Sequence, residues 1–167
     1  MLAGYDAKGI CNHILSEWDA KLHRITNKKI NKLLFFAHGF HLIRTGQPLV
    51  RNNFEAWEHG PVVKVIYHEF KEFGYSPIEK LAYSFDYNEG IDKPFFCNIM
   101  SDPDYDRIMS VIQHYMAFSA DELEAMSHEK DGPWDWVRNR NEGGLGGRIP
   151  NELIKSHFQT RFGAALN

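Results

Sequence analysis

His38 and His41 lie three residues apart in a segment whose apolar residues recur at helical spacing. Residues three apart project from one side of a helix, so the two imidazoles would form a metal site if His68 or Glu69 supplied a third ligand. No HExxH, CxxC or paired-carboxylate motif supports such a site. A histidine among aromatic residues on a half-buried helix is more often a hydrogen-bonded packing residue, so we predict no metal ligand here.

Two further features offer weaker candidates for chemistry. Cys11 and Cys97 are the only cysteines, and neither has a local pattern of base and orienting group. The glycine-rich segment 143–148 would let backbone N–H groups approach a phosphate, but no GK[ST] motif follows it. We therefore interpret residues 141–147 as a flexible loop, and we predict no catalytic residue and no cofactor.

Most of the elements that would position these side chains are predicted to be helices. The central one is expected from about Asn27 to Arg44, with Thr26 as N-cap and Gly46 as the closing left-handed residue. Its apolar face carries Ile30, Leu33, Leu34, Ala37, Phe40 and His41. Segment 54–57 suggests a short strand, and Pro61 is expected to start a second helix that ends at Gly74.

The remaining helices are predicted from caps and apolar spacing. A first helix is expected over 5–21, and another after Ser101, with Pro103 and Asp104 in its first turn. Ser119 and Glu122 form a capping box for a short helix, a helical turn follows Pro133, and a last helix runs over 150–158. The fold class is therefore mainly α: a single compact helical domain, residues 1–167, of about five to seven helices with one small β element.

Composition fits an ordinary globular protein. The chain has 167 residues, of which 43% are apolar and 25% charged, with a formal net charge of −3. It lacks an apolar run long enough for a membrane span and a recognisable signal peptide, so we expect a cytoplasmic protein. A basic cluster gathers near the start of the central helix and is the only candidate nucleic-acid footprint; it consists of Lys21, His23, Arg24, Lys28, Lys29 and Lys32.

A longer pattern links several of these segments. It begins with Lys-Leu-Leu and two aromatic residues followed by alanine at 32–37, and continues with Pro48-Leu49. Glu-Ala-Trp at 55–57, Gly-Pro-Val at 60–62, and Tyr67 with Phe70 follow. The pattern ends with Met-Ser-His at 126–128, Pro133-Trp134, and a late segment that contains Ile149, Pro150, Ile154 and Phe158. In this order it resembles the Panacea domain family, formerly a domain of unknown function and also found in phage-associated proteins.

The resemblance implies an antitoxin of a toxin–antitoxin pair. Such a protein would neutralise a toxin encoded by an adjacent gene through direct protein–protein contact, without catalysis. It also implies structural roles for the motif residues Leu33, Leu34, Trp57, Gly60, Pro61, Tyr67, Phe70, Pro133 and Trp134. The alternatives are a DNA-binding regulator of its own operon, based on the basic cluster, and a metal-dependent enzyme, based on the histidines.

Two segments have aromatic residues beyond what a helical stripe needs, and these are the candidate toxin-binding surfaces. Trp136 is the first, because it projects from a different helix face than Trp134; the acids near it that would speed association are Asp121, Glu122, Glu124, Glu129 and Asp131. The second is Tyr83, Phe85 and Tyr87, whose alternation is typical of a strand, within either a hairpin or an ordered loop. We expect these three aromatic side chains to pack onto the helical core.

Overall fold

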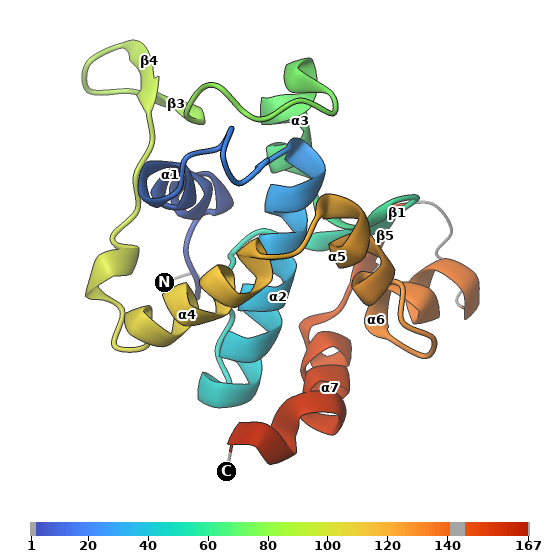
Figure 1. The fold of residues 1–167 in the computed structure, drawn as a ribbon. Helices are drawn as coiled ribbons and strands as arrows, with labels where there is room; N and C mark the ends of the chain where they lie inside the picture. The colour runs from blue at the N-terminus through green and yellow to red at the C-terminus, as the bar shows by residue number, and fades with distance from the viewer. Residues whose placement is uncertain (1–2, 141–145, 167) are drawn as a thin grey trace.

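The computed structural model describes residues 3–140 and 146–166. Helix α2 (Asn27–Thr45) runs through the middle of the molecule, with the other helices arranged around it (Figure 1). Its caps are the predicted ones. Thr26 accepts a hydrogen bond from the N–H of Lys29 at 3.1 Å, and Gly46 closes the helix at φ 73°.

The described elements confirm a mainly α fold with more β structure than we predicted. The α-helices besides α2 are α1 (Ala7–Glu17), α3 (Lys64–Phe70), α4 (Tyr105–Met116), α5 (Ala120–Ser127), α6 (Pro133–Asp135) and α7 (Asn151–Phe162). A π-helical turn (Trp136–Arg140) continues α6, and short 3-10 turns lie at Lys71–Phe73, Ile99–Ser101 and Gly163–Leu166. The strands are β1 (Phe54–Trp57), β2 (Gly60–Val63), β3 (Tyr83–Asp86), β4 (Ile91–Pro94) and β5 (Gly147–Ile149). They form two antiparallel sheets, in the orders β2-β1-β5 and β3-β4.

α2 is covered on several sides rather than along one face. Helices α4, α5 and α7 and strand β2 all pack against it, so polar residues such as Asn31, Lys32 and His38 are buried together with the predicted apolar ones. The approach of α7 is especially close, because a Cβ atom at Gly39 would lie 2.3 Å from the ring of Phe158. The absence of a side chain at Gly39 therefore lets Phe158 reach the backbone of the central helix.

Pro61 does not start a helix, contrary to our prediction. Residues 60–63 form strand β2, which pairs with β1 across a two-residue turn and places Pro61 opposite Ala56. Proline is tolerated there because β2 is an edge strand. Helix α3 begins three residues later, at Lys64, and Gly74 ends the 3-10 turn that follows α3 rather than α3 itself.

Two other helix boundaries differ from the prediction. Helix α1 is shorter than 5–21, because Asp6 caps it and Trp18 is already extended. Helix α4 begins at Tyr105, so Ser101 is not its cap; the carboxylate of Asp102 instead accepts the N–H of Asp104 at 2.7 Å. The other predicted cap is confirmed, since Ser119 and the side chain of Glu122 form a reciprocal capping box for α5.

Strands β3 and β4 form a hairpin at the edge of the molecule (Figure 1). Our expectation that its aromatic residues pack onto the core is wrong. Tyr83, Phe85 and Tyr87 are 41%, 49% and 90% exposed, because a two-stranded sheet at the periphery has no element over that face. Phe85 and Tyr87 contact each other edge to face at 5.0 Å.

The buried apolar side chains form one contiguous core to which every α-helix contributes. Strands β1, β2 and β5 add Phe54, Ala56, Val63 and Ile149 to it. Within residues 3–140 and 146–166, no helix has the length and apolar character needed to cross a membrane.

Candidate functional site

The first predicted candidate, His38, is fully engaged by the protein. Its Nδ1 accepts the N–H of Val50 at 3.1 Å, so Nε2 carries the proton and donates to Oδ1 of Asn151 at 3.0 Å. Burial lowers the pKa of His38 to about 4, which keeps the ring neutral. With both ring nitrogens in hydrogen bonds, His38 offers no lone pair to a metal.

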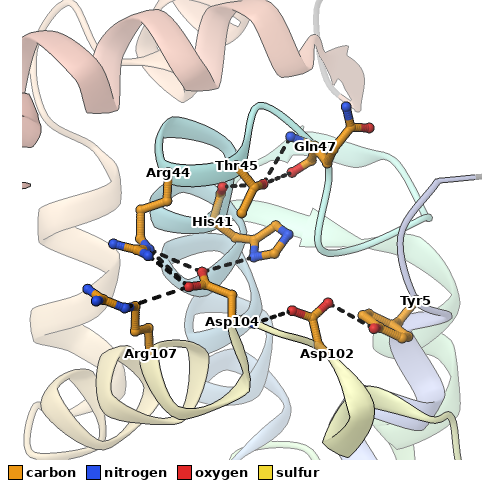
Figure 2. Close-up of polar contacts among 8 residues, drawn as sticks. All are labelled: Tyr5, His41, Arg44, Thr45, Gln47, Asp102, Asp104 and Arg107. Atoms are coloured by element: carbon orange, nitrogen blue, oxygen red, sulfur yellow. Dashed lines mark hydrogen bonds and ion pairs between the residues drawn. The ribbon is translucent and has the colours of Figure 1, made fainter.

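His41 faces a different set of groups, at the junction of α2 and α4 (Figure 2). Its Nδ1 lies 3.5 Å from the carboxylate of Asp104 and has no hydrogen-bond partner among the described residues. Arg44 holds the same carboxylate with three contacts of 2.9–3.1 Å. Burial lowers the pKa of His41, and the neighbouring Asp102 and Asp104 oppose that shift. The cluster therefore joins two helices through an Arg–Asp pair.

The proposed third ligands lie elsewhere. His68 is exposed on α3 beside Trp57, and Glu69 is bound to Lys8 and to the N–H of Tyr83. The described part of the chain contains no group of three or more His, Cys, Asp or Glu side chains placed to hold a metal ion.

The two cysteines are poor nucleophiles in this structure. Burial raises the pKa of the Cys11 thiol well above its ordinary value and raises that of Cys97 as well. A nucleophilic thiol needs a lowered pKa, because the thiolate is the reactive form. The glycines at 143 and 144 lie outside the described residues, while Gly147 and Arg148 belong to strand β5.

The motif residues, in contrast, converge on one place. Trp134 from α6 donates its indole N–H to the carbonyl oxygen of Trp57 at 2.7 Å. Its ring also stacks on the His128 ring, with the centroids 3.7 Å apart. The indole N–H of Trp57 donates to the carboxylate of Glu55 at 2.7 Å. The rings of Trp57 and Tyr67 are in contact, with their centroids 4.7 Å apart. We call the set Lys32, Trp57, Gly60, Tyr67, Ser127, His128 and Trp134 the motif cluster. Among the other motif residues, Leu33, Leu34, Phe70 and Pro133 are buried.

Lys32 is the member whose importance the sequence alone did not reveal. Its side chain is 1% exposed, and its ammonium donates to the carbonyl oxygen of Pro61 at 3.1 Å. Gly60 lies against it at φ 104°, and the loss of hydration lowers the pKa of Lys32 to about 7. The signal available in the sequence was the position of Lys32 directly beside the apolar residues Leu33 and Leu34. That α2 is buried on more than one side is known only from the structure.

The basic cluster does not form a free positive surface. Lys29 is buried and donates to the carbonyl oxygens of His23 and Met116. Lys28 is bound by Asp121 and Glu124, and Lys21 lies 3.3 Å from Glu79. Lys28, Lys29 and Lys32 are therefore engaged within the protein, whereas Lys21 and Arg24 are exposed, so only part of the predicted basic cluster is available to phosphates.

The predicted toxin-binding residues do not form one patch of free charge and aromatic surface. Trp136 is 43% exposed, whereas Trp134 is buried, as predicted. Glu122 is engaged in the capping box of α5, and Glu129 is bound by Arg161 at 3.0 Å and by His157 at 3.4 Å. Tyr83, Phe85 and Tyr87 lie on the separate β3–β4 hairpin.

Comparisons with known proteins match the part of the chain that contains the motif residues. Residues 30–135 match the family described as Antitoxin SocA-like, Panacea domain. The chain is also similar to the protein named Antitoxin SocA from Caulobacter vibrioides (strain NA1000 / CB15N), with 36% identity over 161 residues, which cover 92% of this chain and 82% of the relative. No solved structure matches the chain significantly. The family match extends from α2 to α6 and contains the whole motif cluster, so this chain belongs to the Antitoxin SocA-like, Panacea domain family.

Proposed function

We propose that this protein neutralises a cognate toxin, encoded by an adjacent gene, by direct protein–protein binding and without catalysis. The observation that carries the proposal is the family itself, since the relative named Antitoxin SocA is similar over nearly the whole chain. An antitoxin that acts by contact needs an exposed surface that a partner can desolvate, and it needs no reactive side chain.

The state of the candidate reactive groups supports a role in binding rather than catalysis. Both ring nitrogens of His38 are hydrogen-bonded within the protein. The thiols of Cys11 and Cys97 have raised pKa values. Each group is therefore stabilised in an unreactive form.

We place the toxin contact at Trp136. Tryptophan is enriched among the residues that dominate binding energy, and this one is 43% exposed on the π-helical turn while its neighbours Trp134 and Val137 are buried. Helix α6, which directly precedes the turn, is held to strand β1 by the hydrogen bond from the Trp134 indole to the carbonyl oxygen of Trp57. A tryptophan side chain has only two rotatable torsions, so it loses little conformational freedom on binding, which favours a stable complex.

The acidic residues near Trp136 have a smaller part in this proposal than the sequence suggested. Glu124 and Glu129 already pair with cations of this chain, so the attraction they exert on a basic toxin is reduced. The exposed aromatic face of the β3–β4 hairpin is the alternative contact surface, and the experiment below distinguishes the two.

The test is co-expression with the product of each adjacent open reading frame that arrests growth. We expect the wild-type chain to restore growth and to co-purify with that product. Matched single substitutions, Trp136→Ala and Tyr87→Ala, then separate the two surfaces, because both remove one exposed aromatic side chain. Failure of the wild-type chain to rescue growth from any adjacent product would contradict the proposed function.

A further inference from the structure

A pocket of about 280 Å³ opens beside the motif cluster. One wall is the first two turns of α2, and the others are the β1–β2 turn and the end of α3. Trp57, Tyr67 and Val62 give it apolar and aromatic surface, while Lys28, Lys32 and Lys71 give it cations. Its size suits a small molecule rather than a peptide segment.

The ammonium of Lys32 is the most unusual group in this wall. A protonated lysine has three N–H donors, and in the described structure only one of them has an acceptor, the carbonyl oxygen of Pro61 at 3.1 Å. The side chain is 1% exposed, so little water reaches the other two donors. A buried cation with unused donors is unfavourable unless an acceptor or an opposite charge is supplied.

The backbone around Lys32 is shaped to leave room for this side chain. A Cβ atom at Gly60 would lie 2.6 Å from Cε of Lys32 and 2.7 Å from Oγ of Ser127. Gly60 therefore has to lack a side chain for Lys32 to reach Pro61. The space left at Gly60 and the hydrogen bond to Pro61 together fix the position of the Lys32 side chain in the pocket wall.

The charged side chains that line the pocket itself are mostly cationic. Lys28, Lys32 and Lys71 stand against one carboxylate among the described lining residues, Glu58, while Asp121 and Glu124, which pair with Lys28 from outside the lining, offset two of the positive charges. Lys71 is exposed and forms no ion pair with any described residue. The charged groups that act on Lys32 are Glu124 from α5, which favours its protonation, and Lys28 on α2, which opposes it; His128 lies near enough for Lys32 to influence its titration.

We infer that this pocket binds a small organic anion, a carboxylate or phosphate attached to a flat apolar body, with the Lys32 ammonium contacting the anionic group. The anion would accept the unused N–H donors, and the ring would lie against the surface formed by Trp57 and Tyr67. Lys71 at the rim adds attraction for the same charge. This site is additional to the toxin contact and lies among different residues.

Two matched pairs of probes test the inference on the full chain alone. Indole-3-acetate is compared with the neutral indole-3-acetamide, and AMP with adenosine, by titration calorimetry and ligand-observed NMR. We expect the charged member of at least one pair to bind at least about tenfold more tightly than its neutral counterpart. The pair with the larger difference assigns the ligand as a carboxylate or a phosphate. Equal binding of the charged and neutral members in both pairs, or no binding of either pair, would overturn the inference.

Substitutions then locate the anion. Lys32→Met keeps the length and apolar stem of the side chain, and it should abolish the charged preference; Lys80→Met, which removes an exposed lysine outside the pocket lining, should leave it unchanged. If Lys32→Met fails to fold, Lys71→Met should still weaken the charged probe several-fold. Because the pKa of Lys32 is about 7, indole-3-acetate should also bind more weakly at pH 8.5 than at pH 6. Unchanged affinity in Lys32→Met, or in Lys71→Met together with a flat pH profile, would refute the assignment.

Discussion

Gly60 and Lys32 share a space that holds only one side chain: a Cβ atom at Gly60 would lie 2.6 Å from Cε and 3.0 Å from Nζ of Lys32. Gly60 also has φ 104°, a conformation that L-residues rarely adopt. The conformation and the close approach therefore both require glycine at this position.

Gly60→Ala should destabilise the fold through both causes. We expect a loss of about 2–4 kcal/mol in the free energy of unfolding, measured by urea denaturation, from backbone strain and overpacking together. Gly90→Ala is the matched control, since Gly90 has φ 70° but nothing within 4 Å of its added Cβ. The difference between the two variants measures the steric part. Similar losses in both would show that Lys32 moves aside at little cost.

Lys32→Met should change how stability depends on pH. The pKa of Lys32 is lowered by burial from 10.5 to about 7, so above pH 7 the unfolded chain binds a proton that the folded chain has released. Stability of the wild type should therefore rise with pH, relative to the variant, by about 2–3 kcal/mol between pH 7 and pH 9. Parallel urea denaturation at both pH values checks this. A constant difference between the two proteins would mean that the folded and unfolded chains titrate alike at this lysine.

His38 should make the protein sensitive to acid. Its pKa is lowered by burial from 6.5 to about 4, so between these values the unfolded state binds the extra proton and the folded state loses stability as the pH falls. The wild type should lose on the order of 3 kcal/mol relative to His38→Gln between pH 6.5 and 4. His114→Gln, at an exposed position on α4, is the control for the loss of an imidazole outside the core.

Trp136→Ala should separate binding from stability. Because Trp136 is 43% exposed, its removal should change the melting temperature little, while affinity for the toxin should fall about tenfold or more. Surface plasmon resonance and thermal denaturation measure the two effects. If the variant unfolds, or binds the toxin as tightly as the wild type, the contact lies elsewhere and the β3–β4 hairpin becomes the surface to test.

Arg44→Leu tests the junction in Figure 2. It removes a bidentate partner from Asp104, whose side chain is 11% exposed, so an incompletely hydrated carboxylate remains at the start of α4. We expect a loss of about 1–3 kcal/mol in the free energy of unfolding. Arg107→Leu, which removes a more exposed cation 3.8 Å from the same carboxylate, should cost less than half as much.

Local signals in the sequence predicted the features that depend on a few adjacent residues. The caps at Thr26, Gly46 and Ser119 are of this kind, because each is a hydrogen bond or backbone conformation within one helical turn. The prediction that Pro61 starts a helix is wrong, because it rests on the preference of proline for the first helical turn alone. The actual position of Pro61, in strand β2, depends on its pairing with Ala56. The register of a hairpin is set by both strands and the turn between them, and a rule for proline alone does not contain that information.

The candidate site was harder to predict than the helices. The motif residues were identified, but their convergence brings together residues as far apart as Lys32 and Trp134, which spacing along the chain does not reveal. The burial of Lys32 and the exposure of Phe85 both contradict the usual preference of their residue types. Each follows from what packs over the residue, and that depends on the whole fold.

The contact between Gly39 and Phe158 has a consequence for the synthesis of the protein. The Phe158 ring seals a face of α2, yet it lies more than a hundred residues further along the chain, and β5 completes the β1 sheet from a similar distance. A nascent chain released only as far as α6 therefore has an uncovered central helix and an open strand edge. The face of α2 that Phe158 covers and the free edge of β1 are therefore buried only after the segment from β5 to α7 has been synthesised.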